Sequence, residues 1–179
     1  MKFPKHIVST NVSSDIIRMC NHFAEQSYLT NIECYRYRKQ TSPDKIQQDI
    51  ATGKLAEWGV YFIYLNRDWR CITPPDMKVY PAEQKSFDAD LRWSTFNLHV
   101  KSQTQESADR YGDSWIFQAK DPLFDNATEH DIIIGCRVKL DSGDIKIRLE
   151  KPFNELVFGE TKMSKFKDNK RAIYLKDNE

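Results

Sequence analysis

Residues 131–149 read DIIIGCRVKLDSGDIKIRL, and this stretch decides the fold class. The apolar run at 132–134 predicts a strand over 131–140 that is buried on both faces of a sheet. Ser142-Gly143 predicts a turn, and residues 144–149 alternate between polar and apolar types, which is typical of a strand with one buried face. The stretch therefore predicts two strands joined by a turn.

More strands are predicted on both sides of this stretch. Residues 87–93 and 96–101 are rich in strand-forming types and are separated by two residues, as in a hairpin, while 114–118 predicts a third strand. Residues 166–175 have room for one more short element. Residues 32–38, with aromatic and β-branched side chains, predict a short strand or an extended segment.

Helices are predicted in the N-terminal part of the chain. Apolar residues recur at helical spacing after Ser13-Ser14, and either serine can cap that helix. Ser42-Pro43-Asp44 predicts a second helix start, and this helix either breaks or kinks at Gly53 before an apolar face continues over 54–65. Pro74-Pro75 ends the helical region. Helices followed by strands indicate an α+β or mixed α/β class.

Composition and charge place limits on the class of protein. The chain has 179 residues, with 27 Lys+Arg and 26 Asp+Glu, and we expect one domain over 1–179. A net charge of +1 neither favours nor excludes a nucleic acid partner. The apolar runs fall short of the roughly 20 residues that a spanning helix needs, so no membrane association is expected. The four cysteines stand far apart, which favours reduced thiols and a cytoplasmic protein.

Four polar residues form the candidate site. Glu57 falls on a predicted helix, Asp90 in a predicted strand, and His99 and Lys101 in the next strand. Side chains at i and i+2 of a strand share a face, so His99 and Lys101 point the same way. If the hairpin pairs, Asp90 lies beside them, and the group gathers at one end of the sheet. Such a cluster is costly unless it binds a metal or a polyanion.

The order of these residues resembles that of the PD-(D/E)XK nuclease superfamily. Glu57, in GKLAEWG, resembles its first-helix glutamate, Asp90, in DADL, its central metal-binding aspartate, and Lys101, in HVKSQ, its motif lysine. The resemblance covers residues 54–118. It implies a restriction-endonuclease-like fold, with a central mixed β-sheet flanked by helices and a core over 43–150. It also implies a metal-dependent endonuclease that hydrolyses DNA, with Mg²⁺ or Mn²⁺ as cofactor.

The chain departs from the family pattern at two positions. His99 stands where the family has an acid, and Ala89 where it has proline. Either His99 ligates the metal, which favours Mn²⁺ over Mg²⁺, or another acid replaces it, Asp88 and Glu57 being the candidates. The alternative is an inactive nuclease-like fold that binds nucleic acid or a protein. An α+β interaction protein with no nucleic acid role is a third possibility.

The resemblance implies a division of roles. A metal held by carboxylates activates water and neutralises charge on phosphorus, and a lysine orients the water. Gln103, two residues after the lysine, continues that face. The candidate metal ligands are Asp90, Glu57, His99 and Asp88, and the candidate catalytic residues are Lys101, Asp90, Glu57 and Gln103.

Basic segments near both ends are candidate nucleic-acid contacts, although exposed charges explain each of them equally well. One segment interleaves bases and aromatics at 36–39, and the densest lies at 162–171. No phosphate-binding loop motif occurs, so no nucleotide cofactor is expected. A homodimer is expected by analogy, because two sites cut two strands. The candidate DNA contacts are Arg36, Arg38, Lys39, Lys165, Lys167 and Lys170.

Overall fold

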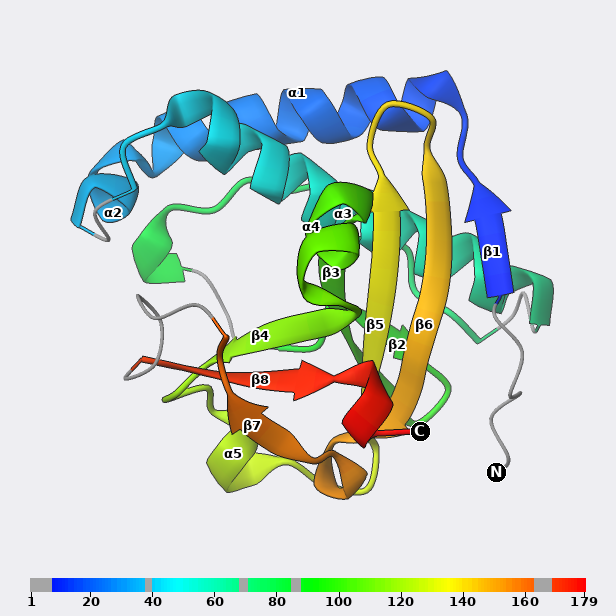
Figure 1. Ribbon diagram of the computed structural model, residues 1–179. Coiled ribbons are helices and arrows are strands. Elements are labelled where there is room, and N and C mark those ends of the chain that lie inside the picture. Colours follow the sequence, from blue (N-terminus) through cyan, green and yellow to red (C-terminus); the bar gives the residue numbers. More distant parts are fainter. Residues whose placement is uncertain (1–7, 38–39, 68–70, 85–87, 163–168) are drawn as a thin grey trace.

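The computed structural model describes residues 8–37, 40–67, 71–84, 88–162 and 169–179 (Figure 1). A five-stranded mixed sheet carries helices on one face and a three-stranded antiparallel sheet on the other. The predicted α+β class, with a mixed sheet flanked by helices, is confirmed. No helix in the described part of the chain combines the length and apolar character needed to cross a bilayer.

The two sheets differ in strand direction. The larger has the order β1-β6-β5-β3-β2, in which β3 and β5 are parallel and all other pairs antiparallel, and the smaller has the order β4-β8-β7. The strands are β1 (Val8–Asn11), β2 (Leu91–Trp93), β3 (Phe96–Thr104), β4 (Ser114–Gln118), β5 (Asp131–Lys139), β6 (Asp144–Pro152), β7 (Phe158–Glu160) and β8 (Lys170–Tyr174).

Residues 131–149 form the two strands that their pattern predicts. β5 has six consecutive buried residues because both of its faces are covered, and β6 alternates between buried and less buried positions. The hairpin of β2 and β3 is also confirmed, with Leu91 opposite Leu98. β2 is shorter than predicted: residues 88–90 lie outside it, and residue 87 lies outside the described residues.

The length of β2 matters for β3. β2 pairs only with residues 96–98, so the C-terminal part of β3 has β5 on one side and no strand partner on the other among the described residues. We call residues 99–104 the open edge of β3.

The helices agree with the sequence in part. They are α1 (Ser14–Thr30), α2 (Ile32–Tyr37), α3 (Pro43–Arg67), α4 (Gln105–Tyr111) and α5 (Leu123–Asn126). Ser13 caps α1, accepting from the Ile16 N–H. A break at Gly53, one of the two expected outcomes, does not occur, because α3 is one helix from Pro43 to Arg67. The strand expected at 32–38 is also wrong. This segment is helical because Tyr35 is buried and stacks on Tyr28, and such packing overrides strand propensity.

Two apolar cores lie on opposite faces of the larger sheet. One joins α1 and α3 to the face that carries Leu98 and Ile134, and the other joins the smaller sheet to the face that carries Ile133. Contacts across both are close. A Cβ added to Gly59 of α3 would lie 2.7 Å from the Ile145 side chain, and one added to Gly135 would lie 2.7 Å from the Trp115 ring.

Candidate functional site

Glu57 is a buried carboxyl on α3. Its Oε2 accepts from the Lys54 ammonium at 2.7 Å, one turn earlier on the helix. Burial first and the neighbouring Asp90 carboxylate second raise the pKa of Glu57 to about 8, against the opposing effect of Lys54. Glu57 and Asp90 therefore lie within electrostatic reach of each other.

Asp90 stands just before β2 and is exposed. Its Oδ2 accepts from the backbone N–H of Val100 at 2.7 Å. This bond attaches the Asp90 carboxylate to the beginning of the open edge, between the two motif residues His99 and Lys101. We call Glu57 and Asp90 the acid pair.

His99 and Lys101 share a face, as predicted. Strand alternation places Leu98 and Val100 against α3, whereas His99 and Lys101 face the smaller sheet. The expectation that Glu57 meets both motif side chains at one point is wrong, because β3 itself separates them. No group of three His, Cys, Asp or Glu side chains able to hold a metal occurs among the described residues.

His99 has a buried partner that the sequence did not indicate. Its Nε2 lies 2.8 Å from Oδ1 of Asp131, which also accepts from the Asn97 amide, while Oδ2 of Asp131 accepts from the N–H and hydroxyl of Thr128. Burial would raise the pKa of Asp131, but hydrogen bonds from His99, Thr128 and Asn97 hold it at about 2. The parallel register placed Asp131 opposite Asn97, on the face of His99. His99 thus belongs to a polar network at the start of β5, away from Glu57.

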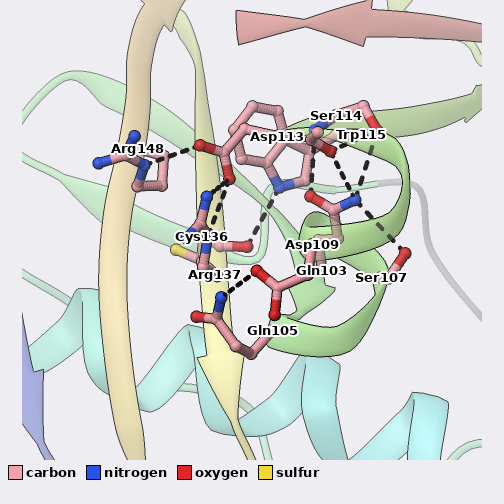
Figure 2. A network of polar contacts seen from close by, with 11 residues as sticks. Gln103, Gln105, Ser107, Asp109, Asp113, Ser114, Trp115, Cys136, Arg137 and Arg148 are labelled. Atoms are coloured by element: carbon pink, nitrogen blue, oxygen red, sulfur yellow. Dashed lines mark hydrogen bonds and ion pairs between the residues drawn. The ribbon is translucent and has the colours of Figure 1, made fainter.

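Gln103 is also occupied. Its Oε1 accepts from the Ser114 N–H at 3.0 Å and its Nε2 donates to the Gly112 carbonyl at 3.1 Å, so the amide fastens β4 to β3 (Figure 2). Beside it, Asp113 binds Arg137 of β5 and Arg148 of β6 at 2.6 and 2.9 Å. The contacts of Gln103 and Asp113 together hold the smaller sheet against the larger one. In the structure the Gln103 side chain therefore has a structural role.

A cavity of about 440 Å³ opens along the open edge of β3. It takes residues from both faces of the strand, since Val100 and Ser102 line it together with Lys101. α3 forms one wall, and β4, β8 and residues 161–162 form the other. We call it the lysine recess, because its lining includes Lys45, Lys101, Lys162 and Lys170.

Asp90 adjoins this recess through Val100, although neither acid of the pair is among the residues that line it. Val100 both lines the recess and binds Asp90. On α3, Thr52 lines the recess, and Glu57 lies five residues, or about 7.5 Å along the helix axis, further on. The Asp90 carboxylate and Lys101 therefore both adjoin the open edge of β3, where Lys101 lines the recess and Asp90 binds the Val100 N–H.

The remaining candidates are scattered. Asp88 is exposed, and Arg36 is exposed on α2 in an ion pair with Glu33 at 2.6 Å. Lys170 lines the lysine recess. Four candidate DNA contacts lie outside the described residues: Arg38, Lys39, Lys165 and Lys167.

The arrangement has two chemical capacities. Two neighbouring carboxylates need positive charge, and a recess lined by lysines attracts anions.

Comparison of the chain with family models, with curated proteins and with solved structures gives no match.

Proposed function

We propose that this chain is a divalent-metal-dependent endonuclease that hydrolyses DNA phosphodiester bonds, with a restriction-endonuclease-like arrangement of its sheet and helices. The observation that carries the proposal is that Asp90, which lies within electrostatic reach of Glu57, binds the open edge of β3, and this edge also lines the lysine recess. A nuclease needs carboxylates for its metal beside cations for its substrate, and Asp90 and Lys101 adjoin the same strand from different sides.

The donor set fits a hard divalent cation. Mg²⁺ is commonly held by one or two carboxylates, with waters and substrate phosphate oxygens completing an octahedral shell. Glu57 and Asp90 supply the carboxylates, and the electrostatic strain between them is the kind that a cation relieves. When bound, the ion would polarise the phosphate and lower the pKa of an attacking water. His99 does not fit this set, because its imidazole is bound to Asp131 on the other face.

The residues of the chain have distinct positions in this proposal. Lys54 holds Glu57 in place, and the Val100 N–H holds Asp90. Lys101 lies with its ammonium 4.6 Å from the Phe117 ring centroid and 4.0 Å from Asp121, at the side of the recess. From there its flexible side chain contributes charge to a bound phosphate.

The second candidate function is a nucleic-acid-binding module without catalysis. The network of His99 and Asp131 favours it, because this residue stands at the motif's acid position and its ring is used in a structural contact.

Nicking of a supercoiled plasmid separates the two functions. Wild-type protein is incubated with the plasmid in Mg²⁺, in Mn²⁺ and in EDTA. The nuclease requires cleavage in either metal that is lost in EDTA and in Asp90→Asn. Asp125→Asn is the control, since Asp125 is an exposed acid on α5 outside both the acid pair and the lysine recess and should leave cleavage unchanged. Retention of the plasmid with no cleavage in any metal would support the binding module instead.

A further inference from the structure

The lysine recess has an unusual composition for a surface cavity. Among the described residues that line it, four are lysines and one is an acid, Asp49, whose carboxylate is bound by Lys45 at 2.8 Å. Hydroxyl side chains from β3, β4 and α4 line it too, including Ser102, Ser107 and Ser114. A concave site of one charge sign concentrates oppositely charged ligands. The recess therefore suits the phosphates of a polyanion.

Aromatic rings stand among these cations. Tyr111 and Tyr174 line the recess, and the Lys162 ammonium lies 4.9 Å from the centroid of the Tyr174 ring and donates to the Tyr111 carbonyl at 3.1 Å. The Lys162 ammonium, the Tyr174 ring and the Tyr111 backbone oxygen are thus gathered at one point, while Tyr111 itself lines the recess. Interleaved cations and aromatic faces are typical of sites that bind single-stranded nucleic acid, in which backbone phosphates meet lysines and bases stack on rings.

The size of the recess decides between one strand and two. Its volume of about 440 Å³ lies within the range of small-ligand sites. Such a cavity holds a nucleotide unit but not a stacked duplex, whose bases are inaccessible until they leave the helix. Unpairing costs a few kcal/mol in a duplex and nothing in a single strand.

We propose that the lysine recess seats one nucleotide of a single strand, with its phosphates at Lys45, Lys101 and Lys162 and its base against Tyr111, so that the chain binds single strands more tightly than duplex. This inference rests on the proposed function for the assignment of a nucleic acid substrate. It goes further in specifying single-stranded nucleic acid as the preferred ligand and in naming the residues that bind it.

Fluorescence anisotropy in EDTA tests the inference without cleavage. The probes are a fluorescein-labelled 12-nucleotide oligo-dT and a blunt duplex of the same length. The single strand should bind at least tenfold more tightly. Lys45→Ala and Lys162→Ala should each weaken binding about fivefold at 0.1 M salt and reduce the slope of log K against log[salt] by about 0.7, the value for one phosphate contact on a single strand. Tyr111→Leu should weaken binding without changing the slope, since stacking releases no counterions.

The control is Lys146→Ala, which removes an exposed lysine on β6 outside the recess and should leave affinity and slope unchanged. Equal or tighter binding of the duplex, or losses in Lys45→Ala and Lys162→Ala no larger than in Lys146→Ala, would overturn the inference. The plasmid-nicking assay tests the nuclease proposal independently of this binding assay. Single-strand binding through the recess without any metal-dependent cleavage keeps this inference and removes the nuclease.

Discussion

Two glycines in α3 differ only in what surrounds them, and this difference gives a direct test of how the helix packs. A Cβ added to Gly53 would meet no atom within 4 Å, whereas one added to Gly59 would lie 2.7 Å from the Cβ and Cγ2 of Ile145. Alanine is more favourable than glycine in a helix interior by about 1 kcal/mol. Both substitutions gain this amount, so their difference isolates the contact between α3 and β6.

Gly53→Ala should raise the free energy of unfolding by about 1 kcal/mol. Gly59→Ala must push the helix away from the sheet or force Ile145 off its rotamer, and such overpacking costs about 1–3 kcal/mol. The free energy of unfolding of Gly59→Ala should thus be about 1–3 kcal/mol lower than that of Gly53→Ala. For a difference of about 2 kcal/mol the melting temperatures should differ by roughly 4–8 °C in a chain of this size.

Urea unfolding followed by circular dichroism at 222 nm measures both variants against the wild type. Equal stabilisation by the two substitutions would show that α3 does not approach β6 at Gly59. A loss of stability in Gly53→Ala would show that the helix is not regular at that point, as the sequence alone had indicated.

Three further outcomes are expected. Lys101→Ala should reduce plasmid cleavage roughly 100-fold with an unchanged melting temperature, measured on one preparation; unaltered cleavage would make Lys101 an ordinary strand lysine. The pKa of Asp131 is about 2 in the fold against 3.8 ordinarily, so its charge stabilises the fold above pH 3.8 and that contribution is lost as pH falls through 2. Asp131→Asn should therefore cost about 2 kcal/mol at pH 7 and about 1 kcal/mol at pH 3 in urea titrations, and a constant cost would contradict the assignment. His99→Glu should destabilise the fold by about 3 kcal/mol, because it sets a second carboxylate against Asp131, while His99→Gln should cost less; equal melting temperatures would place His99 outside that network.

The sequence predicts those parts of the fold that local pattern determines. β5 and β6 follow from their apolar periods and from the turn between them, and the starts of α1 and α3 follow from Ser13 and from Ser42-Pro43. The helix α2 could not be predicted in this way, since its strand-like composition is outweighed by the burial of Tyr35. The continuity of α3 also depends on tertiary contact, because packing on the sheet on either side of a glycine offsets its weak helix propensity.

In the candidate site, too, the features set by local sequence pattern could be predicted and those set by tertiary contact could not. The spacing of His99 and Lys101 correctly places them on one face, and the alternating Leu98 and Val100 are the apolar residues that α3 covers on the other. The sequence thus held a sign that Glu57 of α3 lies on the other side of β3 from the motif lysine. The partner of His99 could not be predicted, because the parallel register that brings Asp131 to it joins segments 32 residues apart.

The open edge of β3 reconciles this separation with a common site. A strand in the middle of a sheet isolates its two faces, and a carboxylate on one face then cannot share a ligand with a lysine on the other. β2 ends its pairing at residue 98, and beyond that point the edge is capped by the Asp90 carboxylate and bordered by the lysine recess. Lengthening β2 by two paired residues would displace the carboxylate from the Val100 N–H and close the edge at the point where the two faces meet. The brevity of β2, three residues at the end of a hairpin, is therefore the feature of the fold on which the proposed site most depends.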